Sequence, residues 1–170
     1  AVDGNGHATS YAFDALNRQI RVTDAEGGVA RFSYDAVSNL LTQTDALGRV
    51  TSYVYDARNE LISQFAPDGV ETRFAYDRVG NRVSITRAAN TPLAATTTFT
   101  YNRDDQLTAQ TDPLGNTTRF AYDPNQNRTT ITDARGNATT YAYDANNRVV
   151  SITDPLGNVV RYRYDGNGNR

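Results

Sequence analysis

Hydrophobic and polar residues alternate along short stretches of this chain. The stretch TRFAY (residues 72–76) places Thr, Phe and Tyr on one face and Arg and Ala on the other, and RVSIT (residues 82–86) alternates Val and Ile with polar residues. Aromatic and β-branched residues at a period of two are typical of β-strands. Residues 56–64 (DARNELISQ), read alone, resemble a helix, but the pattern around them favours strands.

The strand phrase returns many times. Each copy ends in an aromatic residue that is followed by Asp or Asn, and successive copies lie 21 residues apart, apart from one gap of 25. The final aromatic residues are Phe13, Tyr34, Tyr55, Tyr76, Tyr101, Tyr122, Tyr143 and Tyr164. One period that is interrupted only by a four-residue insertion, around residues 87–98, identifies a tandem repeat array.

The period divides the chain into about eight units of one array. We expect them to span residues 3–23, 24–44, 45–65, 66–86, 87–111, 112–132, 133–153 and 154–170. The sequence starts at the second turn of one unit and stops after the first turn of another, and neither end carries a polar capping repeat. We therefore expect these residues to be a fragment of a longer array.

Each unit is predicted to contain two tight turns. The first starts at the Asp after the aromatic phrase, as at Asp35, Asp56, Asp77, Asp123 and Asp144, and the second reaches its Gly at Gly27, Gly48, Gly115, Gly136 or Gly157. Asp-x-x-Gly and Asp-x-x-Asn suit a type I turn followed by a left-handed residue, because Asp bonds to the turn backbone and Gly or Asn tolerates a positive φ.

Strands joined by tight turns pair antiparallel. The expected fold is therefore all-β: a continuous antiparallel meander of about fifteen short strands that curls or spirals. Rows of tyrosine, packed with aliphatic residues of the intervening strands, would take the place of a globular core.

Composition agrees with a thin fold and excludes several classes of site. Only 38% of the 170 residues are hydrophobic, and the chain has no Cys, so it can form neither disulfides nor thiolate metal sites. The net charge is −2 and the arginines are spread evenly, which gives no basic footprint for nucleic acid. No apolar run approaches the length of a membrane span, so membrane insertion is not expected.

The units resemble the RHS or YD repeat, whose form is approximately DxxGxxTxYxYDxxGNLxxxT. Residues 45–65 and 154–170 are close to that form. Departures are local: Phe13 replaces a tyrosine, Asn102 and Ala66 replace aspartates, and the fifth unit lacks its DxxG.

The resemblance implies a structural, non-enzymatic role. Such repeats build a β-strip that spirals into a hollow shell in bacterial polymorphic toxins, insecticidal toxin complexes and teneurins, and in the toxins the shell encloses a C-terminal cytotoxic domain. It implies a secreted or cell-surface bacterial protein, whose partners are neighbouring repeats and an enclosed toxin domain. The self-cleaving segment and the toxin domain of those proteins are not recognisable in this sequence.

No catalytic residue or cofactor is expected. His7 is the only histidine, and a lone His favours an exposed residue at a strand edge. The paired Asp104 and Asp105 fall in a turn without a buried acid partner. Rows of Tyr beside Arg also suit sugar stacking, although the same rows are expected from the packing of the repeat.

Calcium remains open as a weak alternative. Asp165, Asn167 and Asn169 offer oxygen ligands at alternate positions, as does the segment DGNG at residues 3–6. The bidentate acid that completes such loops is missing, and the same residues are expected in these turns for conformational reasons.

Size separates two possible functions. Fifteen strands about 4.8 Å apart would close into a ring only about 23 Å across, too narrow for a toxin domain with a radius of gyration of about 13 Å. The residues could form one arc of a larger shell that encapsulates a toxin for secretion and delivery. Alternatively, open sheet edges could pair between copies into an extracellular filament, coat or adhesion scaffold.

Overall fold

The structure is a computed structural model that describes residues 8–170. Those residues form strands and turns only, and they contain no helix capable of crossing a bilayer. The strands are β1 (Ser10–Phe13), β2 (Gln19–Thr23), β3 (Val29–Tyr34), β4 (Leu40–Thr44), β5 (Val50–Tyr55), β6 (Leu61–Phe65), β7 (Glu71–Tyr76), β8 (Arg82–Arg87), β9 (Ala95–Tyr101), β10 (Leu107–Thr111), β11 (Thr117–Tyr122), β12 (Arg128–Thr132), β13 (Ala138–Tyr143), β14 (Val149–Thr153) and β15 (Val159–Arg161).

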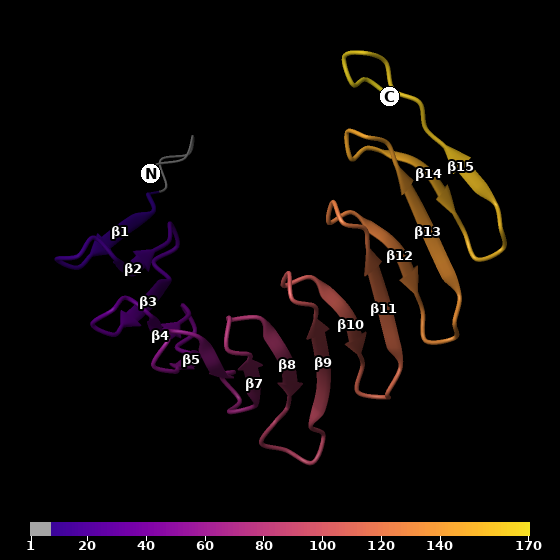
Figure 1. Cartoon of the computed structure of the whole chain (residues 1–170). Coiled ribbons are helices and arrows are strands. Elements are labelled where there is room, and N and C mark those ends of the chain that lie inside the picture. Colours follow the sequence, from indigo (N-terminus) through magenta and orange to yellow (C-terminus); the bar gives the residue numbers. More distant parts are fainter. Residues whose placement is uncertain (1–7) are drawn as a thin grey trace. The chain divides into compact units, whose positions relative to one another are not determined.

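The fifteen strands have the same order in the sheet as in the chain (Figure 1). By contact, the chain forms two compact units, Ala1–Ala95 and Thr96–Arg170. In the first unit each of β1 to β7 pairs antiparallel with the next strand, and in the second β9 to β14 do the same. The predicted all-β antiparallel meander is confirmed.

The pairings alternate between two forms along the chain. Strands joined by a first turn carry a register shift just before the last aromatic residue, as between Ala75 and Tyr76 in the pair β7 and β8. Strands joined by a second turn have no shift and pair over three residues only, as in β6 with β7, where the last pair is Ser63 with Arg73. A bulge of this kind bends and twists the strand locally.

Burial alternates along the strands, but it stays shallow. In β3, Phe32 and Tyr34 are half-buried, whereas Arg31 and Ser33 are exposed. Among the described residues, Ala109 is the only hydrophobic side chain classed as buried, with 9% of its surface exposed. The expectation of a sheet without a globular core is confirmed, so stability must come from contacts between adjacent strands and turns.

The four-residue insertion folds back onto the start of β7. The Asn90 side chain accepts a hydrogen bond from the Glu71 amide (3.0 Å) and donates one to the Gly69 carbonyl (2.9 Å). Glu71 as a whole residue is 4% exposed, yet its carboxylate accepts bonds from Ser63 (2.7 Å) and Arg73 (2.8 Å). These partners compensate the desolvation of a buried charge.

Candidate functional site

The repeated first turn is the most regular feature of the molecule, and the turn at Asp144 illustrates it. The Asp144 amide donates to the Arg148 carbonyl (2.9 Å), and the Asn147 amide donates to the Asp144 carbonyl (3.0 Å). The carboxylate oxygen Oδ1 accepts from the amides of Asn146 (2.9 Å) and Arg148 (3.0 Å). Oδ2 pairs with Nε of Arg148 (2.7 Å). One aspartate therefore organises the whole turn.

Outside the insertion, each hairpin turn of the described residues holds a left-handed residue three positions after its first residue, whereas in the insertion the left-handed residue is Ala88. In the first turns these are Asn17, Ser38, Asn59, Gly80, Asp105, Gln126, Asn147 and Gly168, and in the second turns they are Gly27, Gly48, Gly69, Gly115, Gly136 and Gly157, all with positive φ. This dihedral requirement explains the recurrence of Gly and Asn, because a Cβ is disfavoured there.

Two departures from the repeat keep the turn by other means. The Asn102 Oδ1 atom accepts the amides of Asp104 and Gln106, both at 3.0 Å, as an aspartate would. Ala66 has no side-chain acceptor, but the Gly69 amide still donates to its carbonyl at 2.9 Å, and Gly69 has φ 80°. Gly69 does not belong to an Asp-x-x-Gly motif, because Ala66 takes the place of the Asp, but it lies 21 residues after Gly48 and so shares the repeat phase.

The residue that follows the left-handed position links neighbouring turns. Asn127 Nδ2 donates to Asn147 Oδ1 (2.8 Å), and Asn39 makes the equivalent bond to Asn59 (2.9 Å). Arg18 reaches the Asp35 carbonyl (2.7 Å) in the same way. Sequence reasoning missed this turn ladder, although Asn or Arg often stands four residues after the turn Asp.

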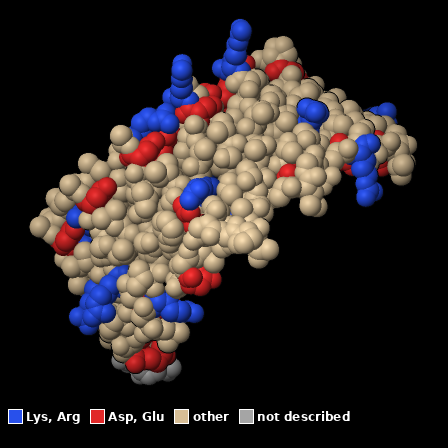
Figure 2. Space-filling model, turned by 90° about the horizontal axis from the view of Figure 1, so that it is seen from below, with Lys and Arg blue, Asp and Glu red and all other residues tan. Residues whose placement is uncertain are grey.

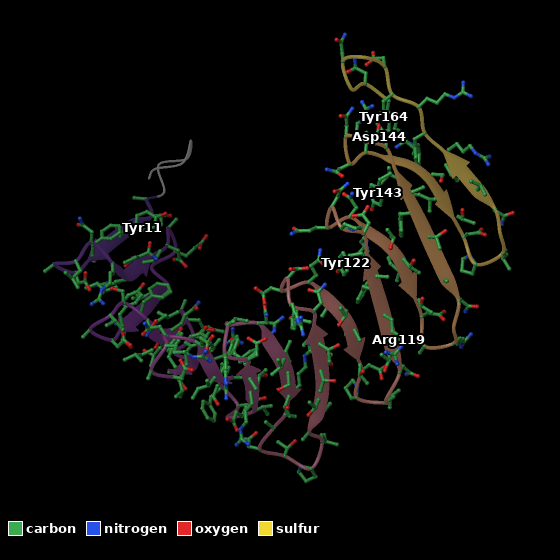
Figure 3. All side chains as sticks on the ribbon, in the orientation of Figure 1. Tyr11, Arg119, Tyr122, Tyr143, Asp144 and Tyr164 are labelled. Atoms are coloured by element: carbon green, nitrogen blue, oxygen red, sulfur yellow. The ribbon has the colours of Figure 1, made fainter. Side chains whose placement is uncertain are left out.

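The final tyrosines bridge adjacent strands beyond the last backbone pair of the three-residue ladders. Their hydroxyl groups donate to a carbonyl at the start of the preceding strand: Tyr34 to Gln19, Tyr76 to Leu61, Tyr122 to Leu107, Tyr143 to Arg128 and Tyr164 to Val149, at 2.9 to 3.0 Å. Figure 3 shows Tyr122, Tyr143 and Tyr164 at corresponding positions on successive hairpins. The hydroxyl thus replaces backbone pairs that the three-residue ladder lacks.

Arginine connects the turn to the tyrosine of the next repeat. The Arg148 guanidinium, paired with Asp144, lies 4.5 Å from the centre of the Tyr164 ring. Arg18 has the same relation to Tyr34, at 4.9 Å. A cation over an aromatic face adds attraction to the packing.

Hydrogen bonds lower the pKa of several turn aspartates. The backbone amide of Arg148 is the main cause that lowers the pKa of Asp144, and the Asn169 side chain is the main cause that lowers the pKa of Asp165. A carboxylate that accepts several N–H bonds is a poor general acid near neutral pH. In the structure these two carboxylates accept hydrogen bonds from the amides of their own turns.

The residues that sequence analysis weighed for chemistry are not gathered into one site. Asp104 is exposed in its turn. Both carboxylate oxygens of Asp165 accept bonds from its own turn, from the amides of Asn167 and Asn169 (2.9 Å) and from the Asn169 side chain (3.0 Å). Within residues 8–170 no three His, Cys, Asp or Glu side chains are grouped to hold a metal. His7 and the segment 3–6 lie outside the described residues.

Charged side chains are dispersed over the surface. Figure 2 shows a face that is mostly uncharged, with basic groups that often stand beside acidic ones. A shallow groove in the second unit lies between two successive second turns, and its lining includes Thr117, Arg119, Thr132 and Asp133.

Comparisons with known proteins agree with this geometry. A family model described as RHS Repeat matches residues 34–64, 55–92, 101–138, 124–157 and 143–170. None of the curated proteins compared with the chain matches it.

Solved structures share the fold at low sequence identity. The crystal structure of TcdB2-TccC3 aligns with a TM-score of 0.63 and 18% identity, over 95% of this chain and 11% of that chain. The Photorhabdus luminescens Tc holotoxin pore aligns less well, with a TM-score of 0.44 and 19% identity over 93% of this chain and 13% of that one. The chain spans about a tenth of the length of these structures. Because the family model matches most of its length and the same two-turn unit recurs throughout, the chain belongs to the RHS repeat family.

Proposed function

We propose that this chain is a non-catalytic wall segment of an RHS shell that encloses a toxin domain for secretion and delivery by a bacterium. The observation that carries the proposal is the turn ladder, in which Arg18, Asn39 and Asn127 each bond their turn to the next repeat. A wall built in this way needs no central core, because every repeat is stabilised by its neighbours. Family membership and the fold shared with TcdB2-TccC3 support the same role.

In this proposal the repeat positions named from the sequence are structural. The final aromatic residues tie adjacent strands, the first aspartates organise their turns, and the glycines supply left-handed backbone. The eight units, from residues 3–23 to residues 154–170, are the repeating elements of the wall. Its partners are then neighbouring repeats and the enclosed domain, and no cofactor takes part.

Electron microscopy of the native, full-length source protein tests the proposal. Closed hollow particles with internal density are expected, and protease should cleave the internal domain only after the particles are opened by denaturant. Long fibres with a regular rise would instead establish the alternative, a self-associating extracellular filament or scaffold. Solid particles without a cavity would contradict both functions.

A further inference from the structure

The ladder between β2 and β3 places two arginines directly opposite each other. Arg21 pairs in register with Arg31, and both side chains are exposed on the face opposite the half-buried Phe32 and Tyr34. Directly opposed residues on antiparallel strands have their Cβ atoms about 4.5–5.5 Å apart, and like charges in this position destabilise a sheet. An opposed arginine pair is therefore unfavourable unless something offsets the repulsion.

No described residue of the first unit forms an ion pair with either arginine. The ion pairs of this unit involve other arginines, and neither Arg21 nor Arg31 has a side-chain hydrogen bond to a described residue. Their other cross-strand neighbours are Ala12 and Thr44, which carry no charge. The row Ala12, Arg21, Arg31 and Thr44 thus holds two positive charges and no acid.

Asp24 and Asp45, which start two of the second turns in this unit, accept hydrogen bonds within their own turns. Asp24 uses Oδ1 to accept the amides of Glu26 (3.1 Å) and Gly28 (2.6 Å). Asp45 accepts the Leu47 and Arg49 amides at 2.9 Å and pairs with the Arg49 side chain at 2.6 Å. These carboxylates therefore serve their own turns.

Equivalent pairs elsewhere in the array avoid this arrangement. The corresponding opposed residues are Thr42 with Ser52, Ser63 with Arg73, Ala109 with Arg119, Thr130 with Thr140, and Ser151 with Arg161. At most one member of each is charged. The repeat itself therefore does not require two arginines here.

We propose that Arg21 and Arg31 form a binding site for one tetrahedral dianion, a phosphate or sulfate group. Guanidinium groups bind such oxyanions through paired N–H bonds, and two of them match the charge of about −2 that a phosphate group carries. The site lies on the exposed polar face of the first unit and is independent of the shell function.

Thermal unfolding of the whole chain tests the site with inorganic phosphate as the probe and sodium chloride at equal ionic strength as the reference. Phosphate should raise the melting temperature further than chloride does, and the rise should saturate, because the anion binds the folded state. Methyl phosphate is the second probe. If it acts as well as phosphate, the site accepts phosphate carried on a larger molecule, and if it does not, the ligand is the free anion.

Arg21→Thr and Arg31→Thr, which copy Thr42 and Thr140, should each weaken phosphate binding about tenfold. In low salt without phosphate, each variant should melt above the parent, because the repulsion is gone. Arg119→Thr is the matched control, since Arg119 faces Ala109, and it should keep the full response. A parent chain that responds alike to phosphate and chloride, or a response that survives both substitutions, would overturn the proposal.

Discussion

Gly136 gives the sharpest test of the turn geometry. Its φ is +86°, and a Cβ added there would meet no atom within 4 Å, so Gly136→Ala changes the dihedral energy without a steric clash. A Cβ in the left-handed region costs about 1–2 kcal/mol. Removing a glycine also restricts the unfolded chain and recovers about 0.4–1 kcal/mol. The net loss should be about 1 kcal/mol, a fall of about 2–4 °C in melting temperature for a chain of this size.

The matched control is Gly166→Ala, in the turn that starts at Asp165. A Cβ at Gly166 also meets nothing within 4 Å, but Gly166 is not among the residues with positive φ. This variant should be as stable as the parent or slightly more stable, because the alanine only reduces the conformational entropy of the unfolded chain. Urea unfolding followed by circular dichroism should give a lower midpoint for Gly136→Ala at an unchanged slope.

Two further variants widen the test. Gly136→Val should lose more stability than Gly136→Ala, because a β-branched residue tolerates a left-handed backbone least. Arg135→Ala, at the exposed turn position next to it, should lose little. Equal melting temperatures for Gly136→Val and Arg135→Ala, or for the two alanine variants, would refute the turn assignment.

Three other predictions follow from the hydrogen bonds. Tyr76→Phe removes the bond to a half-buried carbonyl and should cost about 1 kcal/mol in urea unfolding. Tyr11→Phe, at a half-exposed ring whose hydroxyl bonds to no described residue, should cost nothing, and equal losses would contradict the bridging role. Asn90→Ala should free the insertion and speed its proteolysis, while Asn146→Ala, whose side chain bonds to no described residue, should leave cleavage unchanged. Hydrogen bonds lower the pKa of most turn aspartates in the folded state. The ionised aspartates therefore stabilise the fold at a pH above the unfolded pKa of about 3.9, and this stabilisation is lost as the pH falls through the folded pKa values. The urea midpoint should therefore fall between pH 5 and pH 2, and a constant midpoint would show that the turn carboxylates do not contribute.

The sequence alone determined the features that depend on neighbours along the chain. The period of two, the 21-residue spacing and the Asp-x-x-Gly pattern are local, because a hairpin turn is specified by the dihedral preferences and side-chain acceptors of four or five consecutive residues. The antiparallel meander followed from these turns. The turn at Asn102, where Asn replaces Asp, has the same geometry because the amide oxygen accepts the same two N–H bonds.

Only the tertiary structure decided the contacts between repeats. The ladder between β10 and β11 ends after three residue pairs, and beyond it the Tyr122 hydroxyl meets the carbonyl of Leu107, 15 residues earlier. Asn127 meets Asn147 twenty residues later. Glu71 is buried because the insertion folds over it and brings Asn90 to its backbone. These partners depend on register and bulges, which the alternation of residues does not fix, because many registers satisfy the same pattern of faces.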